Sequence, residues 1–100
     1  MFEMFKKQPN ISCEDLKDKL RGKITLLDVR TTAEYRNGHI NKAKNVPLDT
    51  INSYNNNIKE EIYVICQSGM RSKSAQKILQ KKGYNVINVK GGMNSWYKCN

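Results

Sequence analysis

A single cysteine at the end of an apolar run is the residue best placed to do chemistry in this sequence. The run Ile62–Ile65 leads directly into Cys66. A short loop containing Gly69 follows, and an amphipathic segment begins near Arg71. A strand that ends in a thiol and turns into a helix places free backbone amides next to the sulfur. Because such amides stabilise a thiolate, and Arg71 would add a positive charge, we expect Cys66 to be a nucleophile near neutral pH.

The spacing of this loop distinguishes between two reactions of a thiolate ringed by amides. One is attack on phosphorus, as in a phosphatase or an arsenate reductase, and the other is attack on a sulfane sulfur that the cysteine then carries as a persulfide. The phosphatase signature has one residue more than the four that separate Cys66 from Arg71. A smaller ring suits a single sulfur atom, whose negative charge accepts hydrogen bonds from the amides. A Cys–His hydrolase would depend on His39, the only histidine.

Length and composition indicate one folded domain. One hundred residues suit a single core. No stretch approaches the ~20 apolar residues of a membrane helix, so no membrane association is expected. The first ten residues lack the apolar core of a signal peptide, which favours a cytoplasmic protein. There is no long basic run and no stacking motif, so nucleic-acid binding is not expected either.

The positive charge of the chain is concentrated in its second part. Residues 1–61 contain 11 Lys and Arg against 9 Asp and Glu, whereas residues 62–100 contain 7 Lys and Arg and no acid. An anionic substrate or an acidic partner would be attracted to the part that carries Cys66. The same excess is also compatible with a biased composition rich in Lys, Asn and Ile, so it does not by itself specify a ligand.

The three cysteines do not predict a disulfide framework or a metal site. Cys13, Cys66 and Cys99 form no C-x-x-C pair, and with one histidine a zinc site would have to draw on scattered residues. We therefore expect one working cysteine, Cys66, two incidental ones, and neither a metal nor a cofactor.

Apolar runs and capping signals predict alternating strands and helices. Ser12 with Asp15, and Thr31 with Glu34, have the spacing of a capping box. This alternation favours an α/β fold with a parallel sheet covered on both faces. The expected strands are 24–29, 43–46, 62–66 and 86–89; the expected helices are 13–20, 32–36 and 71–82, with helical turns at 49–52 and after Gly91.

Other polar residues follow the expected strands and would meet the Cys66 loop at one edge of the sheet, where ligands of such sheets bind. Asp28 and Arg30 are expected to hold neighbouring loops by hydrogen bonds rather than to touch a substrate. His39 is interpreted as a loop-packing residue, and Trp96 as a residue of the core or of a pocket wall.

The loop from Cys66 to Ser72 has the pattern Cys-x-x-Gly-x-Arg-Ser and resembles the active-site loop of the rhodanese-like sulfurtransferases. Further stretches are similar to signatures of the same family and occur in the same order. The resemblance covers about residues 10–98. The matching stretches are 27–30 with 34–35 and 38–40, then 43 with 45–48, and 89–92 with 96.

The resemblance implies a single rhodanese-like domain with a five-stranded parallel sheet flanked by helices. We place this domain at residues 10–100, after an N-terminal arm, residues 1–9, that ends in Pro9. It implies that Cys66 carries the persulfide and that Arg71 binds the donor. The loop residues that would bind the substrate, largely through their amides, are Gln67, Ser68, Gly69, Met70 and Ser72.

Two functions are compatible with this resemblance. The first is an enzyme that moves sulfane sulfur from a small anionic donor such as thiosulfate to a thiol, to cyanide or to a protein. The second is a sulfur-relay or binding module that hands persulfide sulfur to a partner protein with little thiosulfate:cyanide activity. A recognition domain without chemistry is disfavoured because the cysteine is present.

Overall fold

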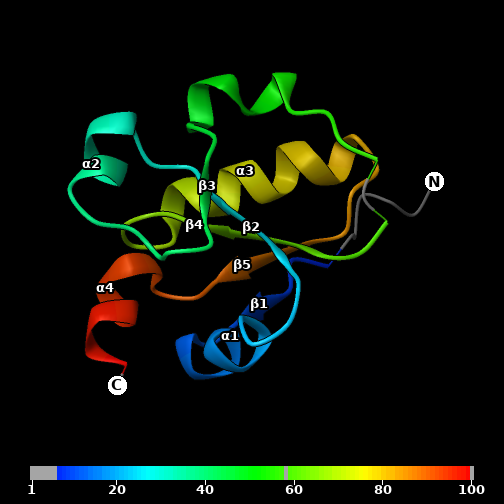
Figure 1. Ribbon diagram of the computed structural model, residues 1–100. Coiled ribbons are helices and arrows are strands. Elements are labelled where there is room, and N and C mark those ends of the chain that lie inside the picture. Colours follow the sequence, from blue (N-terminus) through cyan, green and yellow to red (C-terminus); the bar gives the residue numbers. More distant parts are fainter. Residues whose placement is uncertain (1–6, 58, 100) are drawn as a thin grey trace.

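The computed structural model describes residues 7–57 and 59–99, and it shows one parallel sheet between two layers of helices (Figure 1). The five strands lie in the order β1-β5-β4-β2-β3, and every neighbouring pair is parallel. The expected five-stranded α/β fold is therefore confirmed. The elements are β1 Asn10–Ile11, α1 Cys13–Lys19, β2 Thr25–Asp28, α2 Thr32–Arg36, β3 Lys44–Asn45, the 3-10 helix η2 Leu48–Ser53, β4 Ile62–Ile65, α3 Met70–Lys81, β5 Val86–Val89 and α4 Gly92–Lys98.

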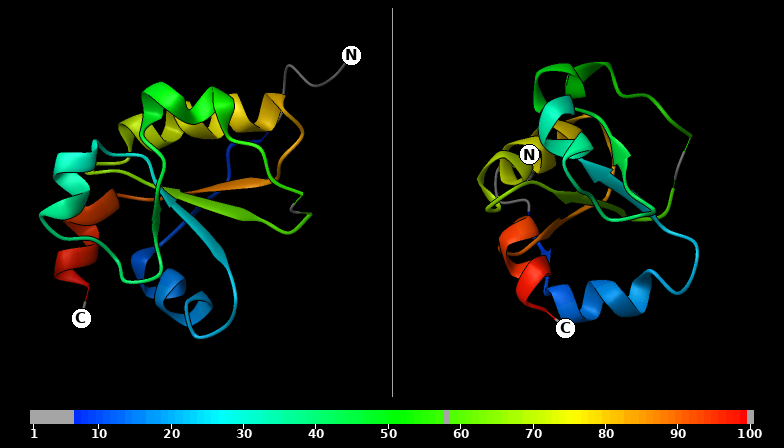
Figure 2. Two further views of the ribbon diagram at one scale, coloured as in Figure 1. Left: turned by 45° about the horizontal axis from the view of Figure 1, so that its top comes forward. Right: turned by 60° about the vertical axis from the view of Figure 1, so that its left-hand side comes forward.

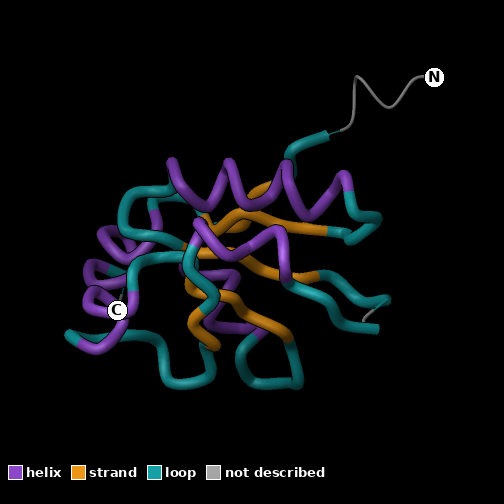
Figure 3. The backbone as a smooth tube through the Cα atoms, turned by 90° about the horizontal axis from the view of Figure 1, so that it is seen from above, coloured by secondary structure: helices purple, strands orange, loops and turns teal. Residues whose placement is uncertain are grey.

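The two faces of the sheet bury separate apolar clusters. On one face, α3 and η2 pack on the sheet through Leu79 and Ile51; on the other, α1 and α4 pack through Leu16 and Met93 (Figure 2). The central strand β4 is buried along its whole length, which explains its continuous apolar run. Viewed from above, α2, the start of α3 and the start of α4 gather near the carboxyl ends of the strands (Figure 3). That end of the sheet holds the Cys66 loop.

The first strand was missed by the sequence pattern. β1 has two residues and pairs Asn10 with Asn88 and Ile11 with Val89 at the edge of the sheet. A segment this short has no periodicity of its own, so only its pairing with β5 defines it. The other strands and helices lie within a few residues of the expected positions.

The described part of the predicted N-terminal arm, residues 7–9, is hydrogen-bonded to the rest of the domain. The carbonyl of Pro9 accepts hydrogen bonds from the Asn88 amide at 3.0 Å and from Gln76 Nε2 at 2.7 Å, and Gln80 Nε2 donates to the carbonyl of Lys7 at 3.0 Å. Residues 7–9 are thus held against β5 and α3 by these hydrogen bonds. Residues 1–6 lie outside the described residues, and the boundary after residue 9 stays a prediction.

The expectation that Cys13 and Cys99 are incidental was wrong. Their sulfurs are joined in a disulfide across 86 residues of sequence, with the two Cα atoms 6.2 Å apart. Cys13 is the first residue of α1, and Cys99 directly follows α4. Because α1 and α4 cover the same face of the sheet, the fold brings the two cysteines together, and nothing in their spacing reveals it.

No helix in the described part of the chain is long and apolar enough to cross a bilayer.

Removing the disulfide is expected to destabilise the domain. Cys13→Ser should lower the free energy of unfolding by about 2–4 kcal/mol, because the bond closes a long loop in the unfolded chain. Urea denaturation of the oxidised protein and of the variant measures the difference. Cys99→Ser should lose the same amount, and a reductant should destabilise only the wild-type chain. Equal stability of the oxidised and reduced wild-type protein would contradict the prediction.

Candidate active site

The Cys66 sulfur lies where β4 ends, enclosed by the turn into α3. The residue is 1% exposed and packs beside Val29 and Val64 in the core. Gly69 begins α3 as its N-cap with φ 104°, in the left-handed region that favours glycine. This backbone turns the Gly69 amide toward the sulfur, and the N–H donates to Cys66 Sγ at 3.0 Å.

Hydrogen bonds outweigh the effect of burial on the Cys66 thiol. Burial alone would raise its pKa, but the Ser72 hydroxyl and the backbone amides of Ser72, Gly69 and Ser68 lower it, and the pKa falls below its ordinary value. The Ser72 Oγ lies 3.2 Å from Sγ. An anion on this sulfur is therefore stabilised by neutral donors held in place by the loop.

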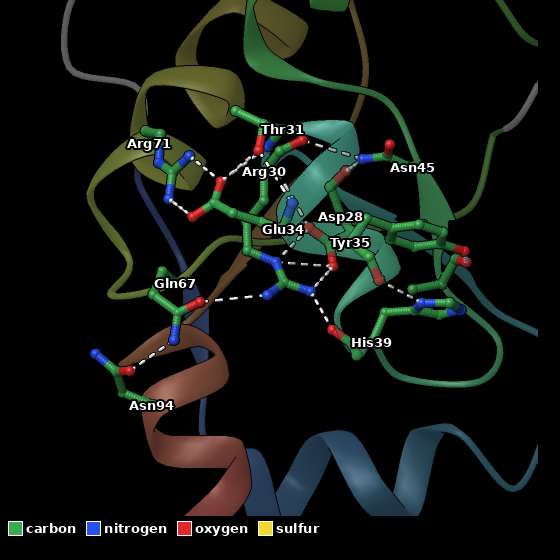
Figure 4. A network of polar contacts seen from close by, with 12 residues as sticks. Asp28, Arg30, Thr31, Glu34, Tyr35, His39, Asn45, Gln67, Arg71 and Asn94 are labelled. Carbon is green, nitrogen blue, oxygen red and sulfur yellow. Dashed lines mark hydrogen bonds and ion pairs between the residues drawn. The ribbon is translucent and has the colours of Figure 1, made fainter.

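Arg30 connects the loop to the end of β2. It is buried and forms an ion pair with Asp28, with Nη2 2.8 Å from Oδ2 (Figure 4). The Nη1 donates to Gln67 Oε1 at 3.2 Å, and the same Nη2 also donates to the Gly38 carbonyl at 2.8 Å. Asp28 raises the pKa of Arg30, so the guanidinium stays charged. These contacts join the loop after β4 to the end of β2, and the expectation that Asp28 and Arg30 support the site stays a prediction.

The start of α4 supports the loop from the opposite side. The amide of Met93 donates to the Cys66 carbonyl at 2.8 Å, and the amide of Asn94 donates to the Gln67 carbonyl at 3.0 Å. Gln67 Nε2 also donates to Asn94 Oδ1 at 2.7 Å. Gly92 permits this approach, because a Cβ there would collide with both carbonyls and its φ is +57°. Glycine at this position therefore meets two backbone demands, a positive φ and close approach to the loop.

Arg71 has a partner that the sequence analysis did not predict. Its guanidinium forms two parallel hydrogen bonds with Glu34, Nη1 to Oε1 at 2.7 Å and Nη2 to Oε2 at 2.9 Å (Figure 4). Glu34 also accepts from the Thr31 amide at 2.9 Å, which completes the predicted capping box of α2. Arg71 is thus a half-buried cation that is already paired, rather than a free charge beside the sulfur. Its role as a donor-binding residue stays a prediction.

An apolar hollow beside the loop was not found from the sequence. It encloses about 450 Å³ between α2, η2 and the start of α3. The loop also presents an apolar side chain to solvent, that of Met70, which is 72% exposed. The run Val46-Pro47-Leu48, which follows a short strand, is the sequence feature that could have indicated this hollow. The run alone does not show which other elements form its walls. The hollow is lined by Val29, Thr31, Thr32, Pro47, Leu48, Asp49 and Arg71.

His39 and Trp96 make packing contacts with other residues. The ring of His39 stacks on Tyr35, with centroids 3.6 Å apart, and its Nδ1 lies 2.8 Å from the Tyr35 carbonyl. Trp96 packs against the cluster beneath α4. Across residues 7–57 and 59–99, the one group with metal-ligand types close together is Cys13, Glu14 and Cys99, and its two sulfurs are bonded to each other.

Comparison with known proteins identifies the family. Residues 12–99 match the Rhodanese-like domain. The chain belongs to the rhodanese-like family. The rhodanese-like domain protein of Staphylococcus aureus superposes with a TM-score of 0.80 at 38% identity, over 89% of this chain and 91% of that one. The human single-domain sulfurtransferase TSTD1 superposes with a TM-score of 0.85, over 94% and 99%; at 24% identity it supports the fold alone.

Curated relatives of this rhodanese-like chain are named both as carriers and as transferases. The putative sulfur carrier protein YrkF of Bacillus subtilis is 40% identical over 93 residues, which cover 88% of this chain and 50% of YrkF. The putative sulfurtransferase YtwF of the same organism is 37% identical over 90 residues, 86% of this chain and 87% of YtwF. The chain thus spans half of the length of YrkF and nearly all of YtwF.

Removing the Ser72 hydroxyl should raise the pKa of Cys66. Ser72→Ala deletes one donor to the buried thiolate while burial still disfavours the charge. The pH midpoint of Cys66 alkylation by iodoacetamide, followed on the Cys66 peptide by mass spectrometry, should move up. Ser68→Ala is the matched control, because it keeps the backbone amide and should leave the midpoint in place. An unshifted midpoint in Ser72→Ala would show that the backbone amides suffice.

The Glu34–Arg71 pair should make stability depend on acid pH. Arg71, followed by the Thr31 amide, lowers the Glu34 pKa from 4.5 to about 2. A carboxylate with a depressed folded-state pKa stabilises the fold above pH 4.5, and this contribution disappears as the pH falls toward about 2. The difference in unfolding free energy between wild type and Glu34→Gln should therefore shrink over that interval. A difference that stays constant over this interval would contradict the prediction, and Glu60→Gln at an exposed position controls for the loss of one carboxylate.

Proposed function

We propose that this rhodanese-like domain transfers sulfane sulfur through a persulfide on Cys66. The observation that carries the proposal is the buried Cys66 sulfur, whose pKa is lowered by the Ser72 hydroxyl and by loop amides despite burial. The same donors would hold the negatively charged outer sulfur of a persulfide. The loop residues Gln67, Ser68, Gly69, Met70 and Ser72 form this cradle, with Asp28 and Arg30 as its supports.

The proposed reaction has two balanced steps. The Cys66 thiolate attacks the outer sulfur of thiosulfate, the new S–S bond forms, and the original S–S bond breaks so that sulfite leaves with its electron pair. A thiolate acceptor then attacks the outer sulfur of the Cys66 persulfide. The acceptor leaves as a persulfide, or as thiocyanate when cyanide is the acceptor, and the Cys66 thiolate is restored. No metal, cofactor or external oxidant enters either step.

A sulfur relay between proteins is the second candidate, and one contact favours it. The charge of Arg71 is compensated by Glu34 through two hydrogen bonds, so a small dianion gains less from this cation than a free arginine would provide. Met70 and the apolar hollow beside the loop offer contact area that suits a protein better than an ion. The relative named as a putative sulfur carrier, YrkF, agrees with this alternative.

Mass spectrometry of the intact protein after treatment with thiosulfate tests the proposal. The wild-type chain should gain the mass of one sulfur atom on the Cys66 peptide and lose it on addition of cyanide or a thiol. Cys66→Ser should show no gain and should keep its fold by circular dichroism. Absence of the adduct with every sulfane donor, or its persistence in Cys66→Ser, would refute the proposal.

The rate at which the Cys66 adduct forms distinguishes an enzyme that acts on small molecules from a relay between proteins. A free small-molecule transferase should turn over thiosulfate and cyanide, and Arg71→Ala should slow its loading about tenfold or more, as loss of a charge-assisted contact predicts. A relay should load slowly from thiosulfate but rapidly from a persulfidated protein, with little effect of Arg71→Ala.

A further inference from the structure

The helix α4 is held at both of its ends. At its start, the amides of Met93 and Asn94 bind the carbonyls of Cys66 and Gln67. At its end, Cys99 is joined to Cys13 of α1 by the disulfide. Two contacts of Lys17 reinforce this second attachment: its Nζ donates to the Cys99 carbonyl and lies 5.4 Å from the centre of the Trp96 ring.

We propose that the Cys13–Cys99 disulfide is a reversible redox site that controls the Cys66 loop through α4. The proposal rests on the sulfur transfer described above and adds its regulation. With the disulfide closed, α4 is fixed to α1 and its first amides support the loop. With the disulfide open, the end of α4 keeps only noncovalent contacts, such as those of Lys17, and the loop loses part of its support.

The shortness of α4 provides the physical link between the disulfide and the Cys66 loop. The helix has seven residues, and a helix so short has little stability without tertiary contacts. Its N-cap Gly91 and its first residue Gly92 have φ of 75° and 57°, and only Lys90 and Gly91 connect the helix to β5. Freed at Cys99, such a helix can fray from its end, and the amides of Met93 and Asn94 are then held by fewer neighbours.

The disulfide is within reach of a small reductant. Both cysteines line a surface hollow of about 340 Å³, although each is largely buried. Lys90 and Lys98 also line this hollow, against the single acid Glu14, so an anionic low-molecular-weight thiol would be attracted there. The other lining residues are Ser12 and Ser95.

The reaction at this site is thiol–disulfide exchange. A small thiolate attacks one sulfur of the Cys13–Cys99 bond, which breaks and forms a mixed disulfide. A second small thiolate then attacks the small-molecule sulfur of this mixed disulfide, and the protein thiolate leaves with the electron pair. The protein thereby gains two electrons and, once both thiolates are protonated, two protons, and the two small thiols leave as their disulfide. The reverse exchange with that small disulfide restores the closed state. Such reversible bonds are the usual kind in a reducing compartment like the cytoplasm expected from the sequence.

Hydrogen exchange and alkylation of the full chain test the coupling. The wild-type protein is compared in two states, oxidised and reduced with glutathione, after the state of Cys13 and Cys99 is verified by mass. Reduction should speed amide exchange at Met93 and Asn94 and raise the pH midpoint of Cys66 alkylation. Loading of Cys66 from thiosulfate at neutral pH should slow about fivefold or more, the lower range of allosteric effects.

Cys13→Ser and Cys99→Ser are the matched variants. Each should behave like the reduced wild-type protein and should not respond to glutathione. Should either variant fail to fold, the two states of the wild-type chain still decide the outcome.

The outcomes separate this proposal from the proposed function. An alkylation midpoint and an exchange rate that are the same in both states would overturn the redox control, whether or not Cys66 accepts sulfur. A shifted midpoint together with no sulfur adduct in either state would instead refute sulfur transfer and leave the coupling standing.

Discussion

The burial of one sulfur atom is the constraint on which the rest of this structure depends. Cys66 is 1% exposed at the end of the central strand, where a charged thiolate without partners would be strongly disfavoured. Its stability as an anion comes from the Ser72 hydroxyl and from amides that converge on it as the chain turns into α3. The turn that brings these amides to the sulfur contains Gly69, whose backbone is left-handed. The Cys66 sulfur and the turn that stabilises its charge are therefore one structural unit.

That unit is fixed from both sides by parts of the chain that do not touch the sulfur. The buried Arg30 joins Asp28 at the end of β2 to Gln67 in the loop, and α4 binds the carbonyls of Cys66 and Gln67. A loop whose amides and carbonyls are both engaged loses little conformational freedom when a sulfur anion is added. This preorganisation is what a persulfide carrier without a cofactor needs.

The ion pair between Arg71 and Glu34 changes the interpretation of the positive charge in the second part of the chain. Residues 62–100 contain no acid, yet the arginine nearest the loop is neutralised by Glu34 from the first part. The pair also ties the cap of α2 to the start of α3, so it positions the walls of the apolar hollow. The domain thus presents a mixed polar and apolar rim around Cys66, which suits a macromolecular surface as well as a small anion.

By itself the sequence determined the order of most strands and helices and the family, and it singled out Cys66 as the residue proposed to react. These features have local signatures: a buried run ending in Cys66, capping residues such as Thr31, and a loop of fixed spacing before Arg71. Tertiary structure alone decided the edge strand β1, the pairing of Arg71 with Glu34 across 37 residues, and the bond between Cys13 and Cys99 across 86. Contacts between distant segments depend on which elements share a face or an edge of the sheet, and no local pattern of residues contains that information.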